Sequence, residues 1–103
     1  MVYRVTFSEQ ASDDLDRIIR YICYDLSNPS AASRFYVAVN DKLDLLRGNP
    51  YIYPLYHDDK LNALGYRFII IGNYLLFFLI DNDSAAVSIV RILYGKRNVS
   101  SIL

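Results

Sequence analysis

The sequence predicts an α+β domain in which an N-terminal strand and a two-helix hairpin pack on an antiparallel β-sheet. The first observation is a change of period. Between residues 11 and 46 apolar residues recur at three- and four-residue spacing, and beyond residue 65 they form short runs separated by turn residues. The second is that the helical segments are consecutive, which is typical of folds with helices on one face of a sheet. A length of 103 residues predicts a single domain, residues 1–103.

The chain opens with a predicted strand followed by an amphipathic helix. Val2 to Phe7 alternates, so every second side chain of the strand shares one face. Ser8 marks the start of the helix, and Asp13 and Arg17 stand at i,i+4 spacing, where they can pair on its polar side. The apolar stripe expected to face the core is Ala11, Leu15, Ile18, Ile19, Ile22 and Leu26.

A second helix follows after a short turn. Asn28 and Pro29 are typical of an N-cap and a first helical position, and Gly48 and Pro50 are expected to end the helix. The stretch from Asn49 to Ala63 shows no sustained period and is predicted to be an ordered loop. The stripe of the second helix is Ala32, Phe35, Tyr36, Val39, Leu43 and Leu46.

Three strands are predicted in the last third of the chain. Tyr66–Ile71 and Tyr74–Ile80 flank Gly72-Asn73, a residue pair that favours a tight β-hairpin. A second turn at residues 82–84 precedes Ala85–Tyr94, which is rich in Val and Ile. We therefore expect an antiparallel sheet, which the N-terminal strand joins.

Composition excludes several classes of protein. The formal net charge is zero and the sequence pI is about 6.5, so the chain is not a strongly basic, nucleic-acid-coating protein. One cysteine, Cys23, allows neither an internal disulfide nor a cysteine-rich zinc site. The longest uncharged run, Phe68–Ile80, is shorter than the roughly 20 residues that span a bilayer. We expect a cytoplasmic protein with no membrane contact and no cofactor.

The two parts of the chain carry opposite charge. Residues 1–59 hold six Lys or Arg against nine Asp or Glu, a net charge of −3, and residues 60–103 hold five against two, a net charge of +3. Arg67 and Arg91 interrupt apolar strands, and Lys96-Arg97 follows the last one, so the sheet can gather a basic surface for an anionic partner. Alternatively, Arg67 and Arg91 pair with acidic residues of the neighbouring turn or of the helices.

Two other sets of residues are candidates for chemistry. Tyr94 stands between Arg91 and Lys96, where its phenol can stack on a base or move a proton, or simply pack. His57 is followed by two aspartates, but adjacent ligands in a turn rarely converge on one ion, so a solvated turn is favoured and no metal site is predicted.

Several short stretches, in an order that covers nearly the whole chain, resemble a known family. Besides the opening strand, they are Ala11 to Leu15 with Tyr21-Ile22, Asn28 to Ala32, Gly65-Tyr66-Arg67, Asn73 to Phe78, and Arg91 to Arg97. Together they resemble the RelE/ParE superfamily of bacterial toxins, the toxic halves of type II toxin–antitoxin modules. The resemblance implies a helix hairpin packed on a curved antiparallel sheet and a cognate antitoxin that wraps around the toxin.

The RelE-like branch implies an enzyme. Its members cut mRNA in the ribosomal A site with basic residues and an assisting tyrosine or histidine. In this chain Arg67, Tyr94 and Arg97 would then be the catalytic residues. RelE places its tyrosine further along the C-terminal segment, where this chain has Ile102-Leu103.

The ParE-like branch implies binding without catalysis. Its members bind DNA gyrase and trap it on cleaved DNA. Arg67, Arg91, Lys96 and Arg97 would then form a contact surface for target or antitoxin. The helix hairpin and the run from Gly65 to Arg97 are closer to this branch, so gyrase is the favoured target and the ribosome with mRNA the alternative. A non-toxic binding module is the third possibility.

Overall fold

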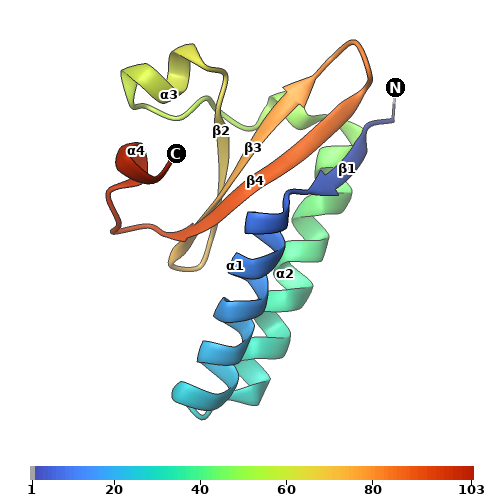
Figure 1. Ribbon diagram of the computed structural model, residues 1–103. Coiled ribbons are helices and arrows are strands. Elements are labelled where there is room, and N and C mark those ends of the chain that lie inside the picture. The colour runs from blue at the N-terminus through green and yellow to red at the C-terminus, as the bar shows by residue number, and fades with distance from the viewer. Residues whose placement is uncertain (1) are drawn as a thin grey trace.

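Four strands form one sheet in the order β1-β4-β3-β2 in the computed structural model, which describes residues 2–103 (Figure 1). The strands are β1 (Arg4–Phe7), β2 (Arg67–Ile71), β3 (Tyr74–Asp81) and β4 (Ala86–Tyr94). Strands β2, β3 and β4 form the expected antiparallel meander. Strand β1 joins the sheet as expected, but it runs parallel to β4. The alternation of apolar and polar residues is the same in parallel and antiparallel strands, so the sequence pattern could not predict the direction of β1.

The turns of the sheet follow their residue types. Gly72 has a φ of +58°, in the left-handed region that glycine adopts without strain, and it begins the predicted hairpin turn with Asn73. The Gly95 N–H donates to the Asn73 carbonyl at 2.9 Å. A Cβ on Gly95 would lie 3.3 Å from that carbonyl oxygen, a tight contact. The end of β4 is therefore held against the β2–β3 turn.

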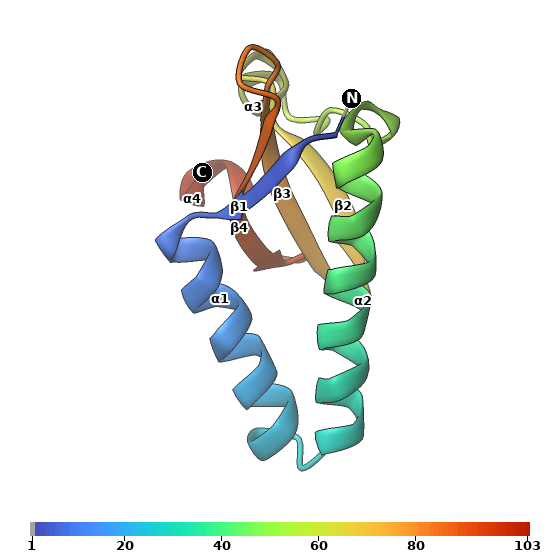
Figure 2. The same ribbon diagram turned by 90° about the vertical axis from the view of Figure 1, so that its right-hand side faces the viewer.

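The two predicted long helices are present with their predicted caps. Ser8 caps α1 (Glu9–Arg20) by accepting from the Ala11 N–H, and Asn28 caps α2 (Pro29–Gly48) by accepting from the Ala31 N–H. One π-helical turn, Tyr21–Asp25, continues α1. The helices converge at the turn that joins them and separate toward the sheet (Figure 2).

Three details of the helices differ from the expectation. Arg17 pairs with Asp14, at i,i+3, and the predicted partner Asp13 is exposed. Tyr36 and Leu26, placed in the apolar stripes, are exposed. Leu26 follows the π turn, whose wider winding shifts later residues off the face that a 3.6-residue period predicts.

The predicted loop between α2 and β2 contains regular structure. It holds a 3₁₀ turn, Pro50–Ile52, and a short helix, α3 (Asp59–Ala63), which Asp58 caps. A further helix, α4 (Val99–Ile102), follows β4. Helices of four or five residues span little more than one turn, so they leave no periodic signal, and the prediction of a loop was wrong at α3 for this reason.

Both faces of the sheet are covered. The helix hairpin packs on one face over a core that includes Phe35, Val39, Leu76 and Phe78. On the other face, α3 and α4 cover a smaller core of Leu61, Phe77, Leu93 and Val99. Within residues 2–103, no helix is both long enough and apolar enough to cross a bilayer.

Candidate functional site

One edge of β4 is completed by side chains of the helical segment. Strand β1 ends at Phe7, opposite Ile89, so the rest of β4 has no strand on that side. The Ser8 hydroxyl donates to the Val90 carbonyl at 2.9 Å, and Asp14 Oδ2 accepts from the Ile92 N–H at 3.0 Å. These two side chains take the hydrogen bonds that a neighbouring strand would make.

Asp14 also binds Arg91 through a two-pronged ion pair. Arg91 Nε lies 2.8 Å from Asp14 Oδ2, and Arg91 Nη2 lies 3.1 Å from Asp14 Oδ1. Asp14 is 5% exposed, and Arg17 approaches its Oδ1 at 3.3 Å from the solvent side. The hydrogen bonds from Arg91 to Asp14 raise the pKa of the guanidinium, although burial alone would lower it. The two parallel N–H···O contacts give the pair the geometry of a strong, two-pronged arginine–carboxylate interaction.

A β-bulge in β4 places Arg91 beside α1. Phe77 of β3 is opposite Arg91, but the next residue, Phe78, is opposite Ile89, so Val90 is the extra residue. Bulges of this kind re-aim the side chains next to them. The sheet irregularity and the ion pair therefore occur at the same place, between α1 and the second half of β4.

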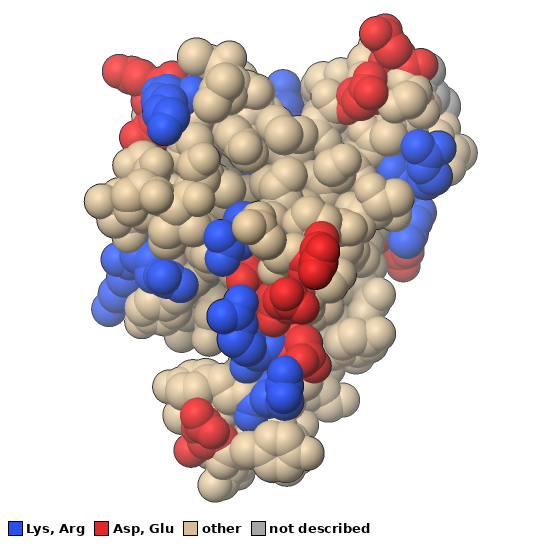
Figure 3. Space-filling view, viewed as in Figure 1, with Lys and Arg blue, Asp and Glu red and all other residues tan. Residues whose placement is uncertain are grey.

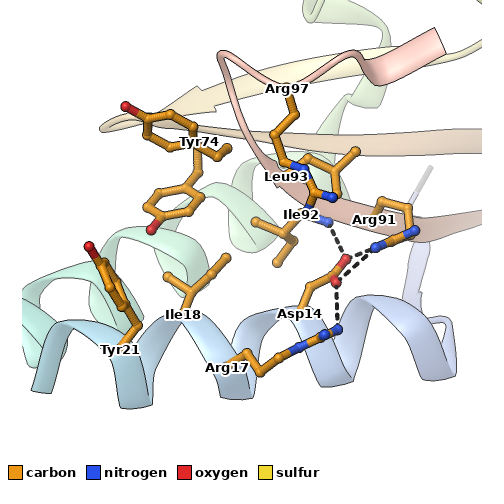
Figure 4. Close-up of a pocket in the computed structure, with 10 residues that line it drawn as sticks. Asp14, Arg17, Ile18, Tyr21, Tyr74, Arg91, Ile92, Leu93 and Arg97 are labelled. Carbon is orange, nitrogen blue, oxygen red and sulfur yellow. Dashed lines mark hydrogen bonds and ion pairs between the residues drawn. The ribbon is translucent and has the colours of Figure 1, made fainter. Parts of the chain in front are cut away.

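Beyond this ion pair, α1 and the end of β4 enclose a cleft of about 340 Å³. Arg97, from the turn after β4, points toward the Asp14–Arg91 pair (Figure 4). The cations of the cleft, Arg17, Arg91 and Arg97, outnumber its one anion, Asp14, so the cleft carries an excess of two positive charges. The lining is completed by Ile18, Tyr21, Tyr74, Ile92, Leu93 and Tyr94.

Tyrosines form the other end of the cleft. Tyr74 and Tyr94 lie opposite each other on β3 and β4, with ring centroids 5.8 Å apart in an edge-to-face arrangement. Tyr21 reaches them from the π turn and is 46% exposed, and Tyr94 is 40% exposed. Burial raises the pKa of Tyr74, and the neighbouring phenols Tyr21 and Tyr94 add to this. The Tyr74 phenol is therefore neutral at physiological pH.

An adjoining hollow of about 550 Å³ shares these three tyrosines. It continues toward the helix turn, where Leu26 and Ala31 line it, and toward Asn73 of the β2–β3 turn. The charged cleft and the aromatic hollow thus form one continuous surface, to which we refer as the Tyr–Arg surface: Arg17, Tyr21, Tyr74, Arg91, Tyr94 and Arg97.

The structure brings only some of the predicted site residues together. Tyr94, Arg91 and Arg97 line the same cleft, and Lys96 is exposed in the turn beside it. Arg67 lies apart on β2, which β3 separates from β4. Its Nη1 donates to the Tyr53 carbonyl at 2.6 Å, and its guanidinium carbon lies 5.1 Å from the ring centroid of Tyr51. The sheet does not gather all four cations on one surface.

Asp14 and Tyr21 are members of this cleft that sequence reasoning missed. The alternative in which Arg91 pairs with a helix acid is the arrangement found, and the acid is Asp14. Asp14 lies three residues after Ala11 and four before Ile18, and these three are the buried residues of α1. An acid at a stripe position of an amphipathic helix is the signal that could have identified it.

The segment around His57, predicted to be a solvated turn, lies outside the cleft. His57 stacks on Tyr56, with ring centroids 4.3 Å apart, and Asp58 caps α3 through the Leu61 N–H. Within residues 2–103, no group of three His, Cys, Asp or Glu side chains is placed to hold a metal ion.

Comparison with known proteins places the chain in a family. A family model described as the ParE toxin of the type II toxin–antitoxin system parDE matches residues 5–99. The chain belongs to the ParE toxin family. No curated protein sequence matches it.

Solved structures share the ParE-family fold at low sequence identity. The chromosomal ParDE system from P. aeruginosa matches with a TM-score of 0.72 and 15% identity, over 92% of this chain and 98% of that one. The RelBE2 toxin–antitoxin complex from Mycobacterium tuberculosis matches with a TM-score of 0.64 and 21% identity, over 91% and 99%. The archaeal RelE–RelB complex from Pyrococcus horikoshii OT3 matches with a TM-score of 0.59 and 18% identity, over 94% and 99%.

Proposed function

We propose that this ParE-family toxin arrests growth by binding and inhibiting DNA gyrase, without a catalytic step of its own, and that a cognate antitoxin neutralises it. The antitoxin part is supported by the similar solved structures, which are toxin–antitoxin systems and complexes. The gyrase part is supported by membership of the ParE family and by the chemistry of the cleft.

The observation that carries the proposal is the state of the charged groups in the cleft. Cleavage of RNA by its own 2′-hydroxyl needs a group that takes a proton and cations that are free to stabilise the developing charge. Asp14 already accepts hydrogen bonds from Arg91, Arg17 and the Ile92 N–H. Arg91 is bound to Asp14 and Arg67 is on another strand, so Arg17 and Arg97 are the cleft cations left to bind an anion, and the carboxylate that could take a proton is already occupied.

The remaining groups of the cleft also favour binding. The chain has one histidine, His57, whose ring contacts Tyr56 and lies edge-to-face with Phe68, outside the cleft. The other side chains of the cleft that could take part in proton transfer are phenols, and a phenol must first lose its own proton before it can act as a base. Tyrosine and arginine side chains are, in contrast, among the residues most enriched in protein-binding surfaces.

Ribosome-dependent mRNA cleavage is the second candidate because one observation favours it. Tyr94 and Arg97, two of the three residues that the RelE-like branch would require, line the same cleft and are exposed to a ligand. In this candidate Tyr94 would take the proton and Arg97 would stabilise the phosphate.

The test uses the purified protein in two assays run side by side. We expect loss of gyrase supercoiling activity on relaxed plasmid, and intact message 5′ ends by primer extension in a purified translation system. Cuts within codons that require ribosomes, with normal supercoiling, would support the second candidate instead. Absence of both effects, together with normal growth after induction, would indicate a non-toxic binding module.

A further inference from the structure

We propose that the Tyr–Arg surface is the part of the toxin that contacts its target, and that its occupant is an acidic segment of the target protein. A carboxylate of that segment would lie at Arg17 and Arg97, and an adjacent apolar side chain would enter the hollow lined by Tyr21, Tyr74 and Tyr94. This inference rests on the proposed inhibition of gyrase and assigns the site through which it occurs.

The charged part of the surface has guanidinium N–H groups that are available to bind a ligand. Arg91 is committed to Asp14 by two hydrogen bonds. Arg17 touches Asp14 through one nitrogen at 3.3 Å and its side chain is 69% exposed, and Arg97 is exposed above the cleft. Because Asp14 neutralises only one of the three cations, an incoming carboxylate is attracted and finds guanidinium N–H groups to bind.

The aromatic part of the surface can receive an apolar side chain. Tyr21 and Tyr94 are partly exposed, although they line a hollow, and Leu26 beside them is also exposed. Exposed aromatic and aliphatic side chains around a hollow are typical of a binding site for a large apolar anchor. Since both parts share the three tyrosines, one short segment can occupy them together.

The surface is held in shape before any partner arrives. Asp14 ties α1 to β4 at Ile92, and the Gly95 N–H ties the end of β4 to Asn73 at 2.9 Å. The Tyr74–Tyr94 contact lies between these two ties. A preorganised site lowers the entropic cost of binding a flexible segment.

A protein segment fits the charges better than a nucleic acid does. The cleft has an excess of only two positive charges. Basic and acidic side chains are interleaved over α1, where Arg20 pairs with Asp16 (Figure 3). Affinity for a phosphate backbone comes from several uncompensated cations in a row. The net charge of zero points the same way.

The test measures binding of the purified protein to purified gyrase by biolayer interferometry. The variants are Arg97→Glu, which reverses the charge at the cleft, and Tyr21→Ala, which removes one wall of the hollow. We expect each to weaken binding about 10-fold or more, as interface hot spots do. Arg34→Glu is the matched control because Arg34 is exposed on α2 and lines a different hollow. We expect it to change binding less than about twofold.

The outcomes separate this inference from the proposed function. Failure of the wild-type protein to bind gyrase would overturn the proposed function and this inference with it. Tight binding by the wild type and equally tight binding by Arg97→Glu and Tyr21→Ala would overturn the inference alone. A third outcome is that the wild type binds a labelled single-stranded oligonucleotide tightly, and that Arg97→Glu loses this binding but still binds gyrase. That result would show that the occupant of the surface is a nucleic acid and would overturn the inference of a protein segment. Circular dichroism of each variant checks that it is folded.

Discussion

Asp14 and Arg91 are 77 positions apart in the sequence and form a two-pronged ion pair, with nitrogen–oxygen distances of 2.8 and 3.1 Å, at the edge of β4 that β1 leaves uncovered. The same carboxylate accepts the Ile92 N–H. The Asp14 side chain thus completes the hydrogen bonding of a sheet edge and holds α1 against β4. It also supplies the one negative charge in a cleft lined by three arginines.

The first prediction concerns the stability that Asp14 provides. Asp14→Asn keeps an oxygen that can accept from Ile92 but leaves Arg91 largely buried without a counter-charge. We expect the free energy of unfolding in urea to fall by about 3 kcal/mol, as when one partner of a buried ion pair is removed. The control is Asp16→Asn in the exposed Arg20–Asp16 pair, for which we expect less than about 1 kcal/mol. Equal, small losses in both variants would contradict the prediction.

A second prediction isolates the pair itself. Arg91→Met alone leaves Asp14 with only Arg17 and the Ile92 N–H as hydrogen-bond donors. Arg91→Met and Asp14→Asn each remove one half of the pair, so we expect each single variant to be less stable than wild type. In a double-mutant cycle with Asp14→Asn and Arg91→Met, we expect a coupling free energy of about 1–3 kcal/mol. Simple additivity of the two losses would show that the pair does not act as a unit.

The third prediction distinguishes binding from chemistry at Tyr94. Tyr94→Phe keeps the ring that contacts Tyr74 and removes only the hydroxyl. If the toxin acts by binding, we expect growth arrest after induction and inhibition of supercoiling to stay within about twofold of wild type. A fall of about 100-fold or more would instead indicate proton transfer by the phenol. Tyr94→Ala, which removes the ring, is expected to weaken inhibition.

The fourth prediction divides the basic surface that the sequence suggested. Arg97→Ala is expected to weaken inhibition of gyrase with little change in stability, because Arg97 is exposed in the cleft. Arg67→Ala is expected to lower the free energy of unfolding by about 1–2 kcal/mol, through loss of its contacts with Tyr53 and Tyr51, and to leave inhibition by the folded protein intact. If a fully folded Arg67→Ala protein no longer inhibits gyrase, Arg67 is part of the surface that contacts the target, and the prediction is wrong.

The fifth prediction concerns alkaline pH. Burial raises the pKa of Tyr74 in the folded protein, so the unfolded chain loses this proton first as the pH rises. The contribution of Tyr74 to stability is therefore present below about pH 10 and is lost as the pH rises through the folded-state pKa. We expect Tyr74→Phe to show a smaller loss of stability above pH 10 in urea titrations. Tyr24→Phe, at an exposed position, is expected to behave like wild type.

Local features of the sequence were sufficient to predict most of the fold. Ser8 and Asn28 cap the predicted helices, and Gly72-Asn73 makes the predicted hairpin turn. Caps, turns and apolar periods depend on residues a few positions apart, so they can be identified without knowledge of the rest of the chain. The same locality is why the four-residue α4 and the π turn were missed.

The sequence by itself determined the α+β class, the two helices, the antiparallel meander and the resemblance to RelE/ParE toxins. Only the tertiary structure decided which charges meet. It pairs Arg91 with Asp14, brings Arg97 and Tyr94 beside them, and leaves Arg67 on β2. These outcomes depend on the order of the strands and on the early end of β1, which exposes the edge of β4 to α1. Strand order is a long-range property that no local period encodes.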